Sequence, residues 1–329
     1  MNTVEKFALG TSREGGRGAL HVGLVNNMPD AALRATELQF ARLLKEASGR
    51  LDVHLHLFSL SEIPRGELAL SRMEGFYADA ATLPSAGLDA LIVTGAEPQA
   101  DDMRDEPYWP ALARLVDWAQ TGAISTLFSC LAAHAAVLHL DGIRRRRLPQ
   151  KLSGVFVAER VNDHALLMGL PALTEVPHSR RNAVGEADLT ARGYRVLTRL
   201  PEGGVDCFAR HDDGRGLLLF LQGHPEYGPE TLGREYLRDM GRFLKGEAVR
   251  PAIPENYFDR VTEDALARLD NICTSPDDIV HYTSIVQGTL PLSSWRAHTL
   301  KLFSNWLSLV AAEKTRRRTK AAARARLRA

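Results

Sequence analysis

The sequence predicts an α/β protein built on a doubly wound, mostly parallel β-sheet. Apolar runs of strand length alternate with helical patterns along the first 250 residues, which is typical of βαβ units. The chain has 329 residues, 45% of them hydrophobic and 25% charged, so it can bury a large core. The candidate catalytic residues follow directly after apolar runs, where such sheets place their ligand sites.

The elements are expected in a regular order. Five apolar runs predict strands, at residues 20–26, 52–58, 89–94, 124–129 and 215–221. Four helical patterns predict helices, at residues 31–47, 107–121, 131–140 and 228–245. Residues 150–215 are less regular and are expected to add antiparallel strands. Beyond Pro251 the pattern predicts one clear helix, at about 295–312.

Charge divides the chain into a body and a tail. The last sixteen residues contain eight basic and no acidic residues, and the whole chain has a net charge of +1, which leaves −7 for the rest. We expect a leader at 1–19, a catalytic domain at 20–250, a helical extension packed on it at 251–312, and a disordered basic tail at 313–329. An acidic body argues against nucleic acid as the main partner.

Composition also limits the class of protein. Three widely spaced cysteines, Cys130, Cys207 and Cys273, fit neither a disulfide framework nor a zinc site, so we expect no metal. The first residues lack the apolar core of a secretion signal, and no run of eighteen apolar residues suggests a membrane span. We therefore expect a reduced, cytoplasmic protein that binds small molecules and no membrane.

Cys130 is the candidate nucleophile. It ends the apolar run 124–129 and is followed at once by the small-residue helical pattern 131–138. A sharp turn from strand to helix lifts the thiol to the edge of the sheet, with the free N–H groups of the helix behind it. Positive potential at that point favours the nucleophilic thiolate.

A histidine and a glutamate follow the last predicted strand. The run 217–221 ends in a short segment that contains His224 and Glu226, two residues apart. Cysteine, histidine and a carboxylate at strand ends are the parts of a nucleophilic triad. The sequence therefore predicts an enzyme.

Nine short motifs occur in order at residues 22–29, 91–96, 108–110, 125–130, 151–156, 177–180, 223–227, 235–239 and 294–298. In this order they resemble the homoserine O-acyltransferases of methionine biosynthesis, which include homoserine O-succinyltransferase and its acetyl-transferring relatives. The resemblance covers about residues 20–312. It implies a class I glutamine amidotransferase-like (flavodoxin-like) fold and suggests a homodimer.

The resemblance implies a double-displacement acyl transfer. Cys130 would take the acyl group from succinyl-CoA or acetyl-CoA as a thioester, and the hydroxyl of homoserine would then accept it. His224 would move the protons and Glu226 would orient the imidazole. The backbone N–H groups of Leu131 and Ala96 would receive the developing oxyanion. Acyl-CoA is a cosubstrate, and no tightly bound cofactor is expected.

Four further residues match family positions. Lys151, Ser179 and Arg238 match positions that contact the amino-acid substrate, and an arginine suits a carboxylate. Gln99 falls at the position that selects the acyl donor. Glycine there accompanies succinyl donors and glutamate accompanies acetyl donors, so glutamine leaves the donor open.

Two alternatives remain. The acceptor could be serine or a related hydroxy-amino acid rather than homoserine. The chain could instead be a glutamine amidotransferase-type amide hydrolase, which would use the same triad on glutamine. That class normally has a Gly-x-Cys-x-Gly elbow, and residues 128–132 lack these glycines.

Overall fold

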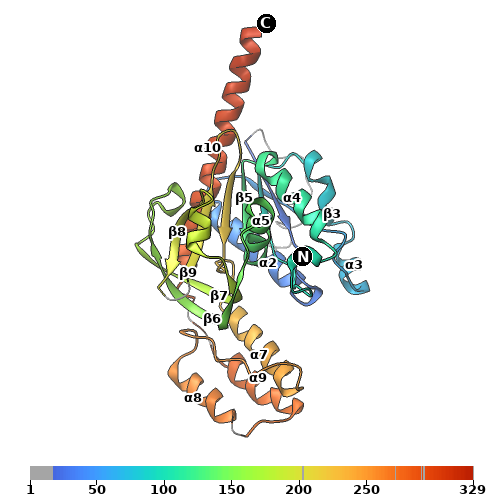
Figure 1. The fold of residues 1–329 in the computed structure, drawn as a ribbon, viewed down its shortest axis with the longest axis vertical. Coiled ribbons are helices and arrows are strands. Elements are labelled where there is room, and N and C mark those ends of the chain that lie inside the picture. The colour runs from blue at the N-terminus through green and yellow to red at the C-terminus, as the bar shows by residue number, and fades with distance from the viewer. Residues whose placement is uncertain (1–17, 202–203, 271, 290, 292, 329) are drawn as a thin grey trace.

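A computed structural model describes residues 18–328, except 202, 203, 271, 290 and 292. The strands of the described residues form one ten-stranded sheet in the order β3-β2-β1-β4-β5-β10-β9-β8-β6-β7. Figure 1 shows this sheet as the centre of the molecule, with helices packed around it.

The first six strands in this order are parallel to one another. They are β1 (Leu20–Val25), β2 (Val53–Ser59), β3 (Tyr77–Asp79), β4 (Ala90–Val93), β5 (Ser125–Ser129) and β10 (Leu217–Leu221). All five predicted strands are present, within two residues at each end. The short β3 was not expected.

Antiparallel strands extend the sheet beyond β10. They are β9 (Gly204–Arg210), β8 (Arg195–Leu200), β6 (Arg146–Arg160) and β7 (Leu173–Ala183). The irregular segment 150–215 thus forms antiparallel strands, as predicted.

Helices cover both faces of the sheet, so the predicted doubly wound α/β class is confirmed. One apolar core lies between the sheet and α4 (Trp109–Gly122), α5 (Leu131–Asp141) and the 3₁₀ turn η1 (Ala80–Ser85). The opposite core includes α2 (Asp30–Ala47) and the packed part of α10 (Arg296–Arg328). The remaining short elements are α3 (Glu67–Met73), α6 (Glu186–Thr190), η2 (Met103–Asp105) and η3 (Ala165–Leu167).

A third core belongs to a helical lobe below the sheet (Figure 1). Its elements are α7 (Thr231–Leu244), α8 (Arg260–Leu269), η4 (Pro276–Asp278) and α9 (Ile279–Gln287). The sequence did not predict α8 or α9. Trp295 is fully buried in this core, and its indole N–H donates to the Tyr227 carbonyl at 3.0 Å. The lobe is therefore tied to the loop that follows β10.

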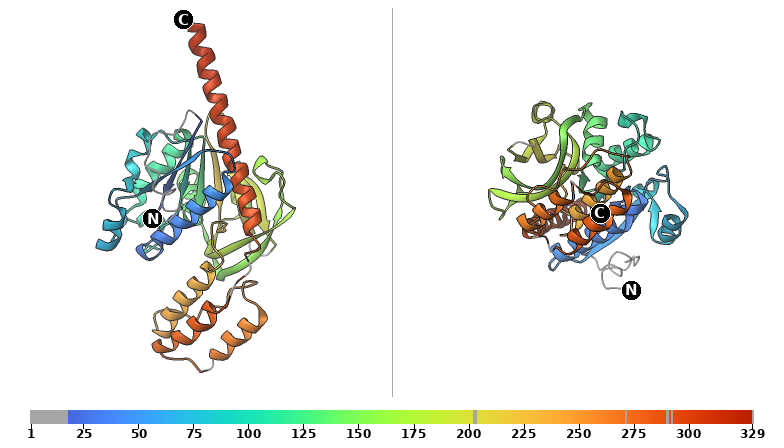
Figure 2. Two further views of the ribbon diagram at one scale, coloured as in Figure 1. Left: turned by 180° about the vertical axis from the view of Figure 1, so that it is seen from behind. Right: turned by 90° about the horizontal axis from the view of Figure 1, so that it is seen from below.

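Helix α10 is longer than predicted. It packs on the sheet through Phe303, Trp306 and Val310, and then projects away from the body up to Arg328 (Figure 2). The expected disordered tail at 313–329 is therefore helical over its described residues. Alanine, arginine and lysine favour helix. Within this part of α10, the Glu313 carboxylate accepts hydrogen bonds from Arg316 and Arg317. The expected leader at 1–19 lies almost wholly outside the described residues.

Within the described part of the chain, no helix has the length and apolar character that crossing a membrane requires.

Candidate active site

Cys130 lies on a strained turn between β5 and α5. Its φ of 50° and ψ of −109° lie outside the ordinary regions for a residue with a side chain, and such strain concentrates at functional sites. Its N–H donates to the carbonyl of Leu221 at 2.7 Å, so the end of β10 holds the turn in place. The half-buried thiol thus stands at the N-terminus of α5, as predicted.

His224 and Glu226 lie on the segment that follows β10, the neighbour of β5 in the sheet. The imidazole Nδ1 is 2.8 Å from Oε1 of Glu226. The ring stacks on Tyr227, with ring centroids 4.4 Å apart, and the backbone N–H of His224 donates to the Pro177 carbonyl of β7 at 2.8 Å. The imidazole is therefore fixed on two sides, and its other nitrogen is left for the thiol.

Charge at the site favours protonated His224. Burial opposes the charged ring, but the Cys130 thiolate and then the Glu226 carboxylate outweigh it, and the pKa of His224 lies well above its ordinary value. A hydrogen bond with the Cys130 side chain contributes in the same direction. The structure therefore brings Cys130, His224 and Glu226 together in the order of a nucleophile, a base and the carboxylate that orients the base.

Gln222 anchors the same segment in the core. Its amide is fully buried, with Nε2 donating to the Val205 carbonyl at 2.6 Å and Oε1 accepting from the Val184 N–H at 3.1 Å. Oε1 also lies 2.8 Å from Nε2 of His134 on α5. Burial lowers the pKa of His134 to about 4, so this histidine is a neutral structural partner.

Gly223 lets the segment lie against β7 and β9. A Cβ there would lie 2.6 Å from Val176, 2.9 Å from Asp206 and 3.0 Å from His178. The buried His178 contacts Asp206 through Nε2 at 3.2 Å, while its Nδ1 accepts from Nε of Arg180 at 3.3 Å. This buried network therefore lies next to the segment that carries His224.

The turn Gly95–Ala96, after β4, lies against the start of α5. A Cβ on Gly95 would lie 2.5 Å from Cβ and 3.3 Å from the backbone nitrogen of Leu131. Only glycine permits this approach, which brings the turn to the first backbone N–H after Cys130. The predicted oxyanion residues Leu131 and Ala96 therefore lie together, beside a small cavity that both of them line.

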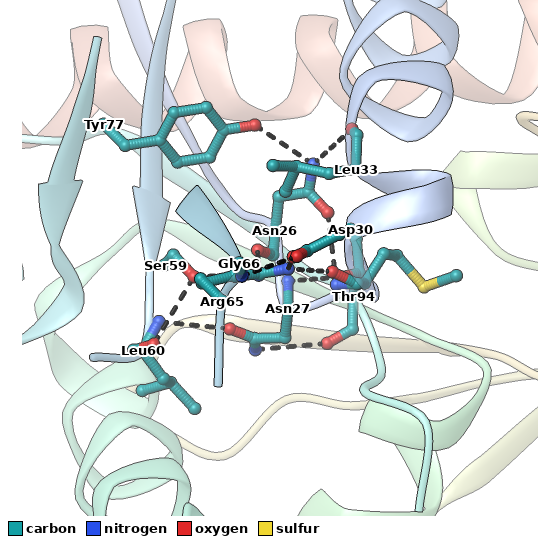
Figure 3. Close-up of polar contacts among 11 residues, drawn as sticks. Asn26, Asn27, Asp30, Leu33, Ser59, Leu60, Arg65, Gly66, Tyr77 and Thr94 are labelled. Carbon is teal, nitrogen blue, oxygen red and sulfur yellow. Dashed lines mark hydrogen bonds and ion pairs between the residues drawn. The ribbon is translucent and has the colours of Figure 1, made fainter. Parts of the chain in front are cut away.

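Figure 3 shows how the preceding residue, Thr94, is held. The Asn27 N–H donates to Thr94 Oγ1 at 2.9 Å, and the Asn27 side-chain oxygen accepts from the Leu60 N–H at 3.2 Å. Arg65 donates to the Met28 carbonyl at 2.5 Å and to the Asn26 carbonyl at 3.2 Å. The strand ends of β1, β2 and β4 are thus joined in one polar network that supports the turn.

Two of the three predicted substrate residues lie together. Lys151 on β6 and Arg238 on α7 both donate to Asp239, with Nζ–Oδ2 at 2.7 Å and Nε–Oδ1 at 2.9 Å. Burial opposes charge on Asp239, but bonds from Lys151 and then the charges of both cations lower its pKa. Ser179 lies on β7, where it pairs with Ser153 of β6.

Gln99 lies on an exposed loop after β4. Its N–H and that of Ala100 donate to Oε1 of the buried Glu106 at 2.6 and 2.7 Å. The loop is also tied to α7, since Arg242 contacts Glu97 at 3.4 Å.

Sequence reasoning missed several residues of this region, namely Asn27, Arg65, Glu106, Tyr108, Arg180, Asp206, Glu235 and Asp239. Most are charged or amide side chains whose partners lie far along the chain, as in the contact between Lys151 and Asp239. Only Asn27, Tyr108, Arg180, Glu235 and Asp239 stood inside the quoted motifs, and that membership was the one available signal.

Comparison with known proteins identifies one protein family. A family model described as homoserine O-succinyltransferase matches residues 11–317. The chain is 49% identical to a homoserine O-succinyltransferase of Rhodopseudomonas palustris, over 94% of both chains. It is 52% identical to one of Methylorubrum extorquens, over 88% of this chain and 87% of that one. Among solved structures, a glutamine amidotransferase of Methylobacillus flagellatus matches 89% of this chain and 96% of that one, at 14% identity and a TM-score of 0.47.

Proposed function

The chain belongs to the homoserine O-succinyltransferase family, and we propose from this that it transfers an acyl group from acyl-CoA to the hydroxyl of homoserine, in methionine biosynthesis. The observation that carries the mechanism is the grouping of Cys130, His224 and Glu226 at the ends of two adjacent strands. A thiolate exchanges readily with a thioester, so the donor chemistry suits this nucleophile.

In the first half-reaction the Cys130 thiolate attacks the thioester carbonyl and expels coenzyme A. The new carbon–sulfur bond forms first and gives a tetrahedral intermediate. The bond to the sulfur of coenzyme A then breaks, and the imidazolium of His224 gives its proton to the departing thiolate. The N–H groups of Leu131 and Ala96 stabilise the oxyanion of the tetrahedral intermediate.

Acylation then changes the role of His224. The Cys130 thiolate is the larger of the two charges that raise the pKa of this imidazole, and the thioester carries no such charge. The pKa of His224 therefore falls in the acyl-enzyme. The neutral imidazole, held by Glu226, can then take the proton of the homoserine hydroxyl as that oxygen attacks the thioester.

The amino-acid substrate is proposed to bind at Lys151, Ser179 and Arg238. A guanidinium offers two parallel donors to the substrate carboxylate, and Arg238 is half exposed on α7. Asp239 holds Lys151 and Arg238 in fixed positions before substrate arrives.

The test is a matrix of donors and acceptors. Purified protein is incubated with succinyl-CoA or acetyl-CoA and with homoserine, serine or glutamine, while free coenzyme A, ammonia and product mass are measured. We expect an O-acyl-homoserine product and coenzyme A release that depends on homoserine. Preferential acylation of serine, or ammonia from glutamine, would replace this function by one of the alternatives.

A further inference from the structure

Two of the buried polar atoms that lack a hydrogen-bond partner among the described residues belong to Tyr108 and Arg145. They are the hydroxyl of Tyr108 and Nη1 of Arg145. Tyr108 is only 5% exposed. A buried donor without a partner destabilises a protein, so a ligand that supplies an acceptor would recover this free energy.

The tyrosine belongs to the cavity beside the nucleophile. Tyr108 lines it together with Gly95, Ala96, Met103 and Leu131. Leu131 and Ala96, whose N–H groups are the proposed oxyanion donors, both line this cavity, so an acyl group on the thiol would lie beside it. Burial, followed by the charge of Glu106, raises the pKa of Tyr108 to about 12, so its hydroxyl remains a donor at neutral pH.

Arg145 brings positive charge to the same region. Its guanidinium feels the charges of Glu106, Asp102 and Cys130, yet within the described part of the chain no carboxylate lies at ion-pair distance from it. Glu106 is engaged elsewhere, since its Oε1 accepts from the N–H groups of Gln99 and Ala100. The arginine therefore keeps a donor for an anion.

The two possible acyl groups differ in what they bring to this cavity. An acetyl group ends in a methyl. A succinyl group carries a second carboxylate about 4 Å beyond its carbonyl carbon, across three carbon–carbon bonds. A carboxylate accepts hydrogen bonds from a hydroxyl and from a guanidinium, and such charge-assisted bonds are the strong ones.

We propose that Tyr108 and Arg145 form the subsite that receives the free carboxylate of a dicarboxylic acyl donor such as succinyl-CoA. This inference rests on the proposed acyl transfer and assigns two residues to the recognition of its donor. It makes the two residues determinants of specificity, whereas the triad performs the chemistry on any donor.

The test compares two donors in matched variants at saturating homoserine. Arg145→Met should lower kcat/KM for succinyl-CoA about 30-fold, from the loss of one charge-assisted contact, and for acetyl-CoA less than threefold. Tyr108→Phe should lower kcat/KM for succinyl-CoA about fivefold. It should not lower the thermal stability, because the Tyr108 hydroxyl has no partner among the described residues. Arg145→Lys should restore part of the succinyl-CoA activity.

The control variant is Arg146→Met. Arg146 is the next residue in the chain, and its exposed side chain pairs with Asp188 at the surface. This change should leave both donors unaffected.

Three outcomes would overturn the subsite. An equal loss for both donors in Arg145→Met would mean a contact with the phosphates of coenzyme A, which every donor shares. Unchanged kinetics in both variants would remove the residues from donor binding, and a wild-type enzyme that uses only acetyl-CoA would exclude the donor class. The proposed function fails separately, if no donor at all acylates Cys130.

Discussion

At the scale of single residues, the main feature of the site is that the charge of Cys130 raises the pKa of His224. The strained backbone of Cys130 places the thiol at the N-terminus of α5, and His224 is fixed by Glu226 and by stacking on Tyr227. Removing one partner should therefore change the pKa of the imidazole as well as the rate.

Glu226→Gln tests the charge that Glu226 contributes. The carboxylate raises the pKa of His224, so its loss should lower that pKa and move the alkaline limb of the kcat/KM–pH profile to lower pH. The rate should fall by about 10³- to 10⁴-fold, as in other triads with a misoriented base. Glu230→Gln, an exposed change nearby, is the control. A near-normal rate with an unmoved profile would reduce the triad to a dyad.

Gln99→Glu tests whether the loop after β4 helps to select the acyl donor. A glutamate at this position would repel the carboxylate of a succinyl group, and charges a few ångströms apart cost about 1–4 kcal/mol. The ratio of kcat/KM for acetyl-CoA over succinyl-CoA should rise tenfold or more. An unmoved ratio would place Gln99 outside the acyl pocket.

At the scale of elements, the apolar strands of the parallel sheet could be predicted, whereas several short helices could not. The parallel strands are continuous apolar runs because both faces are covered, so they stand out in the sequence. Helices α3, α8 and α9 have only one or two fully buried residues each, and short helices depend on tertiary contacts that one sequence does not reveal. The same limit applies to the site, where the triad follows strand ends but Asp206 and Arg145 are placed by packing.

Gly223→Ala tests the contact between the His224 segment and strands β7 and β9. A Cβ at this position meets three atoms at 3.0 Å or less, and such overpacking costs about 1–3 kcal/mol. We expect a lower free energy of unfolding in urea and a loss of activity. Gly241→Ala on α7 is the control, because its nearest neighbours lie at 3.9–4.0 Å and alanine favours helix. Equal stability of the two variants would contradict the close packing.

At the scale of the whole molecule, α10 joins two different regions. Its first half closes one face of the sheet, while residues 316–327 are exposed. Lys314 marks the boundary, since its Nζ lies 2.6 Å from both the Ala19 carbonyl and Asp89. The sequence indicated the charge of this tail, but the continuation of the helix follows from its attachment to the packed half.

Removal of residues 316–329 should therefore change little. We expect kcat/KM within twofold of wild type and a free energy of unfolding within about 0.5 kcal/mol, as for changes at exposed positions. Lys314→Ala should cost about 1–2 kcal/mol, because it removes both contacts. A large loss of activity on truncation would show that the projecting helix contributes to catalysis.

The central claim is that the acyl group passes through a thioester on Cys130, and intact-mass measurement of the enzyme tests it most directly. With succinyl-CoA and without homoserine, the wild-type protein should gain the mass of one succinyl group, mapped to the peptide that contains Cys130. Homoserine should remove the succinyl group from this adduct. The Cys130→Ser variant should not form the adduct at a rate comparable to that of the wild type, and its turnover rate should be at least a hundredfold lower. An unmodified wild-type enzyme that still turns over, or an adduct on another residue, would contradict the account.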